Sequence, residues 1–334
     1  MRAVVFKEVG RVVVEDRPTP RIEDPRDAIV KVTAAGLYGS DLHWFHGYQK
    51  IPADFIPGHE IVGLVEAVGS SVSKFKVGQP VVASFSSQCS QCIYYEKGQT
   101  SRCPEYYLFG NRSTERDIDG GQAEYVRIPY ADTTLTLAPK SIPKQLLVLM
   151  GDIFPTGYFC ASRFLKRMKP EEAKKTVVAV VGCGPVGICA IASALTWSDT
   201  VYAIDMIPER LAEAEKIGAK PLLLSESPAE TIRDATQGRG ADLALEVVGG
   251  QEPFNLCIDL IRPFGIISSV GVQTSDLTFR GPTLHGKNVT IEWGRCPVYD
   301  KVSFLCDKKM KLEDVVKTYE IFDGRRAHKI ILVP

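Results

Sequence analysis

The chain has 334 residues, which is more than one ordinary domain and suits two. Lys and Arg total 40, Asp and Glu also total 40, and 45% of the residues are hydrophobic, as in ordinary globular proteins. A formal net charge of zero argues against electrostatic binding to nucleic acid or to an anionic membrane surface. No apolar run reaches the ~18 residues that span a bilayer, and no secretion signal is visible, so we expect a cytoplasmic protein.

The first 150 residues contain short runs that are rich in β-branched residues and are separated by Gly and Pro. Residues 28–32 and 81–85 are typical of these runs. Such spacing predicts short strands joined by tight turns. A mostly antiparallel, barrel-like domain accounts for this pattern.

The pattern changes near residue 152, after which strands alternate with helices. An apolar strand is predicted at residues 177–181, a helix at 186–197 and a second strand at 201–205. This alternation is typical of βαβ units in a parallel sheet. Near the C-terminus we predict a helix at about 312–322 and a final strand at 330–333.

A glycine motif directly follows the predicted strand 177–181. Gly182, Gly184 and Gly187 form G-x-G-x-x-G, with Pro185 and Val186 opening the next helix. The first glycine permits a tight turn, the second lets the backbone approach a pyrophosphate, and the third lets helix and strand pack closely. The free N–H groups and the positive dipole at the start of the helix then favour phosphate.

Asp205 supports this interpretation. It ends the strand after the motif and lies 18 positions beyond Gly187. A carboxylate there accepts hydrogen bonds from the ribose hydroxyls and repels a 2′-phosphate. The sequence therefore predicts a Rossmann domain that prefers NAD to NADP.

Further motifs follow one another along nearly the whole chain. They are GSDLH at 39–43, GHE at 58–60, a cysteine loop at 89–103, DIFPTGY at 152–158, GAD at 240–242 and SVGV at 269–272. With the glycine motif, they resemble those of the zinc alcohol dehydrogenase branch of the medium-chain dehydrogenase/reductase superfamily. The resemblance implies an α/β chain with a GroES-like catalytic domain at 1–153 and 283–334, and a doubly wound parallel Rossmann domain at 154–282. It also implies a homodimer through the sheet edge near residues 269–277.

In that family a cysteine, a histidine and a third ligand hold a catalytic zinc. The resemblance matches His59 to the histidine, Asp152 to the third ligand and Glu60 to a neighbouring glutamate that can approach the metal. Tyr38 stands at the cysteine position, where a phenol with a pKa near 10 is a poor and bulky substitute for a thiolate. We therefore predict no zinc here. In this zinc-free interpretation Asp152 is a polar group at the cofactor cleft and His59 is hydrogen-bonded to Asp41. Zinc on His59, Glu60 and Asp152 stays an alternative.

The family's second metal site is a loop with four cysteines spaced C-x2-C-x2-C-x7-C. Here the corresponding residues are Cys89, Cys92, Tyr95 and Cys103, so the third thiol is absent. A closed structural zinc site needs four ligands. We therefore expect three reduced cysteines in a packed loop rather than a structural zinc.

The resemblance also implies roles for residues outside the metal positions. Ser40 and His43 match the family's proton relay. Thr156 matches a residue near the nicotinamide ring, and Arg210 and Val270 match cofactor-binding positions. A small-molecule substrate is implied, and no nucleic-acid or membrane partner.

Three functions follow from these observations. The leading prediction is an NAD(H)-dependent oxidoreductase that works without zinc on a small or medium substrate, such as an activated alkene, an imine or a carbonyl compound. Tyr38 then either supplies a proton or fills the vacated metal pocket. The alternatives are a conventional zinc alcohol or aldehyde dehydrogenase, and a non-catalytic nucleotide-binding protein.

Overall fold

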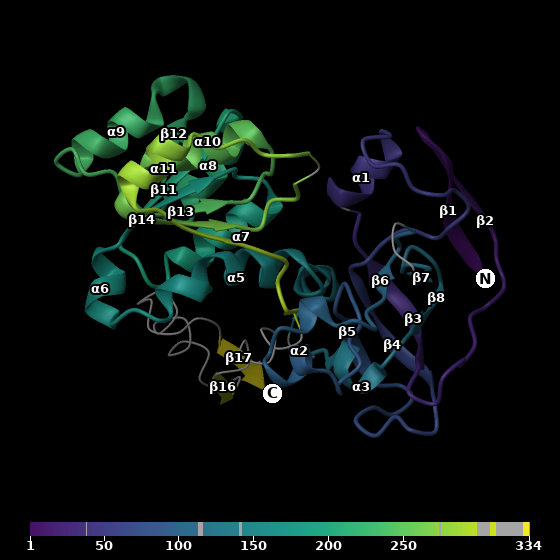
Figure 1. Cartoon of the computed structure of the whole chain (residues 1–334). Coiled ribbons are helices and arrows are strands. Elements are labelled where there is room, and N and C mark those ends of the chain that lie inside the picture. Colours follow the sequence, from purple (N-terminus) through teal and green to yellow (C-terminus); the bar gives the residue numbers. More distant parts are fainter. Residues whose placement is uncertain are drawn as a thin grey trace. The chain divides into compact units, whose positions relative to one another are not determined.

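The computed structural model describes residues 1–37, 39–112, 116–139, 142–273, 275–298, 308–311 and 330–333. These fall into two compact units, shown in Figure 1: unit 1 is mainly Met1–Asp152, and unit 2 is mainly Ile153–Cys296. Within the described ranges, no helix is both long enough and apolar enough to cross a membrane.

Unit 1 is built on a five-stranded antiparallel sheet in the order β8-β3-β4-β5-β9. Its inward-facing side chains, among them Val30, Ile61, Val81, Val126 and Leu135, form one buried cluster. The elements of this unit are β1 Arg2–Glu8, β2 Arg11–Asp16, β3 Ala28–Ala35, α1 Gly39–Phe45, β4 Ile61–Val68, β5 Pro80–Ala83, α2 Ile93–Glu96, β6 Leu108–Phe109, β7 Asp117–Ile118, β8 Tyr125–Ile128, α3 Ala131–Thr134, β9 Leu135–Leu137 and α4 Lys144–Leu147.

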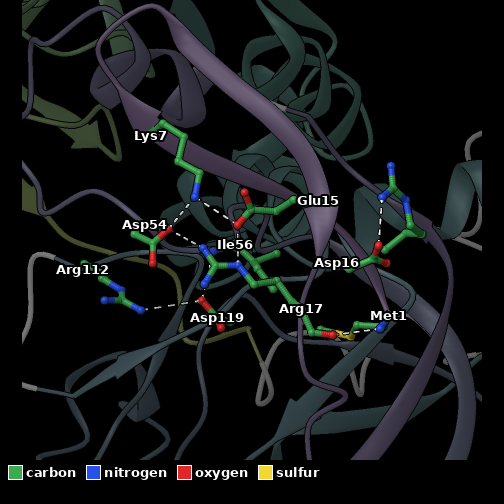
Figure 2. A network of polar contacts seen from close by, with 10 residues as sticks. Met1, Lys7, Glu15, Asp16, Arg17, Asp54, Ile56, Arg112 and Asp119 are labelled. Carbon is green, nitrogen blue, oxygen red and sulfur yellow. Dashed lines mark hydrogen bonds and ion pairs between the residues drawn. The ribbon is translucent and has the colours of Figure 1, made fainter.

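Figure 2 shows a network of charged side chains around the β1–β2 hairpin. The Lys7 ammonium lies 2.7 Å from the Asp54 carboxylate and 3.0 Å from that of Glu15. Arg17 forms ion pairs with the same two carboxylates. The network ties the hairpin to the loop before Ile56, and most of its carboxylates are exposed to solvent.

Unit 2 is a six-stranded parallel sheet in the order β12-β11-β10-β13-β14-β15. Successive residues of β10 point into two different buried clusters: Val178 and Val180 pack with α5 and α7, whereas Ala179 and Val181 pack with α10. Figure 1 shows the helices on both faces of this sheet. The elements are α5 Ile153–Leu165, α6 Pro170–Lys175, β10 Val177–Val181, α7 Pro185–Ala194, β11 Thr200–Asp205, α8 Pro208–Lys216, β12 Lys220–Leu223, α9 Pro228–Ala235, β13 Ala241–Glu246, α10 Gln251–Leu260, β14 Ile261–Ser269, α11 Gly281–Lys287 and β15 Thr290–Trp293.

The strand order reverses between β10 and β13. From β10 the chain builds outward to β11 and β12, then returns to place β13, β14 and β15 on the other side. Crevices at such a switch point, outside the carboxyl ends of the strands, are where open α/β sheets bind ligands. The predicted doubly wound sheet and antiparallel barrel-type unit are both confirmed.

Element boundaries differ from the predictions at several places. The strand predicted at 177–181 is β10, but the helix predicted at 186–197 is α7, which ends at Ala194. The parallel sheet continues past residue 282, because β15 pairs with β14. That pairing makes β15 the edge strand, so residues 269–277 are not the sheet edge expected for a dimer contact, and the homodimer stays a prediction.

Of the two elements predicted near the C-terminus, the structure describes the strand. Residues 330–333 form β17, Ile330–Val333, which pairs in parallel with β16, Lys308–Lys311. The predicted helix at about 312–322 lies outside the described residues.

Candidate functional site

The turn between β10 and α7 is compatible only with small residues. Gly182 has φ = +98°, a left-handed conformation that side chains with a Cβ rarely adopt. A Cβ at Gly187 would lie 2.0 Å from the carbonyl oxygen of Gly182, so strand and helix meet backbone to backbone. A Cβ at Gly184 would meet no protein atom within 4 Å. The first and third glycines are therefore needed by the fold, while the second leaves open space beside the turn.

Helix α7 begins at this turn without a side-chain cap. Gly184 is its N-cap residue and no side chain bonds to the first turn, where Pro185 supplies no N–H of its own. The N–H groups at the start of a helix need an acceptor, and the helix dipole favours a negative one. A phosphate group satisfies both requirements. The turn therefore fits the pyrophosphate of a dinucleotide, with Val186 and Gly187 in the first turn of the helix.

Asp205 lies beside the glycine turn at the end of β11. One carboxylate oxygen accepts the Cys183 N–H at 2.7 Å, and the other accepts the Ile207 N–H at 3.0 Å. The Arg210 guanidinium is 3.7 Å from the same carboxylate and is partly exposed. Two backbone N–H groups thus fix the position of a buried negative charge at the point where a dinucleotide's adenosine ribose is expected.

Two further predicted cofactor residues belong to unit 2. Thr156 lies in the first turn of α5. Val270 directly follows β14, and its N–H donates to the carbonyl oxygen of Glu246 at 3.0 Å. Their contacts with a cofactor stay predictions.

In unit 1, His59 and Asp152 are in direct contact although they are 93 positions apart. The His59 Nε2 atom lies 3.1 Å from a carboxylate oxygen of Asp152. Burial lowers the pKa of His59, but the hydrogen bond and charge of Asp152, with the charges of Asp41 and Glu60, raise it overall to about 9. The 3.1 Å distance fits a hydrogen bond between the His59 ring and the Asp152 carboxyl group.

Glu60 is held differently from this pair. It is buried, and a Cβ at Gly36 would lie 2.2 Å from one of its carboxylate oxygens, so the carboxylate lies against the Gly36 backbone. Among the residues that the structure describes, the only His, Cys, Asp or Glu side chains that converge as three possible metal ligands are three cysteines. His59, Asp152 and Glu60 are not such a group in this structure, and the predicted absence of a catalytic zinc stays a prediction.

The remaining predicted catalytic residues lie in or near α1. His43 is in the last turn of α1, and its ring makes an edge-on contact with Tyr48 at a centroid distance of 6.5 Å. The backbone of Ser40 is in the same helix. The side chain of Ser40 and the whole of Tyr38 lie outside what the structure describes.

The three converging cysteines are Cys89, Cys92 and Cys103, as the sequence spacing suggested. Their sulfur atoms lie within 4.8 Å of one another, and the N–H of Cys89 lies 3.3 Å from the Cys103 sulfur. Burial raises the pKa of the Cys103 thiol to about 12. Three thiols partly fit a closed zinc site, but Tyr95 stands at the position of the missing thiol. The expected absence of a structural zinc stays a prediction.

Sequence reasoning missed one buried carboxylate at the cofactor edge of the sheet. Glu246 ends β13 and is 0% exposed. It accepts the N–H groups of Val248 and Gly249 and the hydroxyl of Ser269. The only signal in the sequence is an acidic residue that directly follows the apolar residues 243–245.

Comparison with known proteins places this arrangement in a family. Residues 24–140 match the family model described as alcohol dehydrogenase GroES-like domain, and residues 185–301 match the one described as zinc-binding dehydrogenase. The chain is 42% identical to the zinc-type alcohol dehydrogenase B of Aspergillus flavus, over 99% of this chain and 81% of that protein. It is 43% identical to a medium chain reductase/dehydrogenase of an Acremonium species, over 84% of this chain and 96% of that protein.

A solved structure shows the same likeness in three dimensions. The alcohol dehydrogenase TADH of Thermus sp. ATN1 is 33% identical, with a TM-score of 0.84 that covers 100% of this chain and 99% of that one. The predicted family resemblance is thereby confirmed. The chain belongs to the zinc-type alcohol dehydrogenase branch of the medium-chain dehydrogenase/reductase superfamily, and is an NAD(P)-dependent dehydrogenase or reductase.

Proposed function

We propose that this enzyme transfers hydride between NAD(H) and a small or medium organic substrate without a zinc ion at His59. The observation that carries the proposal is the pairing of the glycine turn with Asp205 at the switch point of the parallel sheet. When bound there, a nicotinamide cofactor supplies or accepts the hydride.

Asp205 is the reason for preferring NAD to NADP. Its carboxylate is buried and held by two backbone N–H groups, so it does not swing away from an incoming ribose. A 2′-phosphate beside it would bring two negative charges together, which disfavours NADP. Arg210, at 3.7 Å, offsets only part of this charge because it is partly exposed to water.

Zinc independence rests on the donor set. His59 pairs with Asp152, Glu60 lies against Gly36, and a tyrosine replaces the expected thiolate at position 38. Without a Lewis acid, reduction of a simple carbonyl loses several kcal/mol of stabilisation of the developing charge, on the order of what metal catalysis supplies. The substrate class that suits such a site is already activated, as in a conjugated alkene, an iminium group or an activated carbonyl.

Hydride delivered to a conjugated alkene or a carbonyl must be balanced by one proton, whereas an iminium group needs none. We propose the Tyr38 phenol as the donor, with Ser40 and His43 as further relay groups. A Tyr38→Phe variant tests this role. Loss of a proton donor lowers kcat by about 10²- to 10⁴-fold, whereas removal of a hydroxyl from a residue that only fills space leaves kcat nearly unchanged.

The experiment that tests the proposed function combines metal analysis with turnover. Protein purified without chelators or a histidine tag is analysed for zinc per chain. NADH oxidation is then followed across enones, imines, aldehydes and ketones, before and after dialysis against a chelator. We expect less than one zinc at the His59 site and turnover that survives dialysis. Turnover that disappears with the metal and returns with added zinc would contradict zinc independence.

One observation favours a second candidate, the zinc-dependent alcohol dehydrogenase. The 3.1 Å separation of His59 Nε2 and Asp152 is short enough for both atoms to contact one ion. The Tyr38→Cys variant sharpens the choice because it restores the thiolate position of the family. A wild-type chain that already binds zinc as tightly as this variant supports the second candidate.

A further inference from the structure

Glu246 is a buried carboxylate at the end of β13, and both of its oxygens accept hydrogen bonds from the protein. One of its oxygens accepts the N–H groups of Val248 at 2.8 Å and Gly249 at 2.6 Å. The other accepts the Ser269 hydroxyl at 2.6 Å and the Gln273 amide at 3.4 Å. All four donors are neutral. Because two of them follow β13 and the other two lie at and after the end of β14, the carboxylate joins the loops that follow these two strands.

The two loops meet backbone to backbone over this carboxylate. A Cβ at Gly271 would lie 2.7 Å from both oxygens of Glu246 and 2.3 Å from the nitrogen of Gly249. Gly249 has φ = +93°, and a Cβ there would lie 2.2 Å from the carbonyl oxygen of Val272. Both glycines are therefore required by the close approach of the loops.

Gln273 extends the same link. Its side-chain oxygen accepts the N–H of Gly250 at 2.7 Å, while its amide group lies 3.4 Å from the Glu246 carboxylate. The backbone reinforces the arrangement, because the N–H groups of Val270 and Gly271 point to the carbonyl oxygen of Glu246. The loops at 247–250 and 270–273 are thus linked to each other.

The loop at 247–250 also contacts the glycine turn. A Cβ at Gly182 would lie 2.4 Å from a methyl group of Val248, and one at Gly187 would lie 3.4 Å from a methyl group of Val247. The N–H of Val247 also contacts the carbonyl oxygen of Val181 at 3.3 Å. The loop at 247–250 therefore begins beside the pyrophosphate turn.

Strand order indicates which half of the cofactor the loops face. Asp205 ends β11, on one side of β10, whereas β13 and β14 lie on the other side. A dinucleotide whose adenosine ribose is at β11 and whose pyrophosphate is at the turn after β10 must extend past the ends of β13 and β14. The loops held by Glu246 therefore lie on the nicotinamide side.

We propose that Glu246 is a positioning residue for the nicotinamide half of NAD(H). It acts through the loops at 247–250 and 270–273 and contacts no cofactor atom itself. The inference rests on the proposed function, since it requires a dinucleotide in the glycine turn. It predicts that damage to the Glu246 network weakens binding of the whole dinucleotide far more than binding of its adenosine half.

The test compares two ligands, NADH and ADP-ribose, which lacks nicotinamide. Dissociation constants for both are measured by calorimetry on the full chain, together with KM for NADH and kcat. We expect Glu246→Gln to weaken NADH binding about tenfold or more, a factor that corresponds to the loss of roughly one buried hydrogen bond, and to leave ADP-ribose within about twofold. Glu252→Gln, an exposed acid on α10, is the matched control and changes neither constant.

Gln273→Ala provides a milder second variant if Glu246→Gln folds poorly. It removes the link to Gly250 and leaves the two backbone contacts of Glu246 in place, so the same preferential loss of NADH is expected, at a few-fold. A wild-type chain that binds neither ligand overturns the proposed function and this inference together. A wild-type chain that binds both, with equal losses or none in the variants, overturns the role of Glu246 alone.

Discussion

Unit 1 and unit 2 each hold a carboxylate network, and the two differ in burial rather than in the number of contacts. In unit 1, Asp54 joins Lys7 and Arg17 at a solvent-exposed hairpin, as Figure 2 shows. In unit 2, Glu246 is fully buried and accepts mainly from backbone N–H groups and the Ser269 hydroxyl. Of these two networks only that of Asp54 contains ion pairs, yet water can replace each charged partner there.

This difference teaches which polar contacts position a functional site. Exposed ion pairs gain little, because solvent screens their charges and two long side chains lose freedom. A buried acceptor has no substitute partner, so its removal leaves each donor unsatisfied. We therefore expect the geometry at the carboxyl ends of the unit 2 strands to depend on a few hydrogen bonds from neutral donors to a buried carboxylate.

The largest effect is expected from Glu246→Ala, which removes every contact of this carboxylate. Three strong donors, on Val248, Gly249 and Ser269, lose their acceptor, and an unsatisfied buried donor costs roughly 1–3 kcal/mol. We expect a loss of about 3 kcal/mol or more in the free energy of unfolding, measured by urea titration. Glu252→Ala serves as the control, and an equal loss in both variants would contradict the argument from burial.

Alanine substitutions at two glycines of the cofactor turn are expected to affect different properties, the stability of the fold at Gly187 and the binding of NADH at Gly184. Gly187→Ala places a Cβ 2.0 Å from the Gly182 carbonyl oxygen, and overpacking of this kind typically costs about 1–3 kcal/mol. Gly184→Ala meets no protein atom within 4 Å. We expect the second variant to keep the wild-type urea midpoint but to bind NADH roughly tenfold more weakly, because the new methyl group occupies space needed for the pyrophosphate.

That pair of measurements has a clear failing result. If Gly184→Ala binds NADH as tightly as wild type while remaining folded, the cofactor does not approach the turn as proposed. If Gly187→Ala is as stable as wild type, the backbone contact between β10 and α7 is less restrictive than the structure indicates.

Asp205→Asn is expected to have a smaller effect, on cofactor choice. The variant keeps the size of the side chain but removes its negative charge, so repulsion of a 2′-phosphate decreases. We expect the ratio of kcat/KM for NADH to that for NADPH to fall by about tenfold, which corresponds to ~1.4 kcal/mol. Arg210→Ala is the companion variant, and it should lower activity with NADPH in the Asp205→Asn background. An unchanged ratio would show that Asp205 does not determine the preference for NADH over NADPH.

The sequence predicted best where the chemistry is local. Gly182, Gly184 and Gly187 lie within six residues, and Asp205 follows at the end of the next strand, so spacing along the chain alone indicates how they are arranged. Their binding of a cofactor stays a prediction. The family resemblance extended this to the GroES-like unit. Local spacing also brought the three loop cysteines together, as their positions suggested.

Contacts between distant segments were beyond sequence reasoning. His59 and Asp152 were both named as possible ligands, but their direct pairing depends on packing across 93 positions. Glu246 was missed because its donor Ser269 lies 23 positions away, and nothing in the sequence distinguishes a strand that ends in a solvated acid from one that ends in a buried acid. The four-residue strand β15 was missed because so short a run carries too little periodicity.

The smallest effect is expected from Asp54→Asn in the exposed network. Hydrogen bonds from Arg17 and Lys7 lower the pKa of Asp54 from 3.8 to about 2. A lowered folded-state pKa means that any stabilisation by the charged form is present above pH 3.8 and is lost as the pH falls through 2. Because solvent screens these pairs, we expect the urea midpoints of wild type and variant to agree within error at pH 7 and to stay together as the pH is lowered. A loss at pH 7 that rivals that of Glu246→Ala would show that the number of ion pairs, rather than burial, determines the strength of a network in this protein.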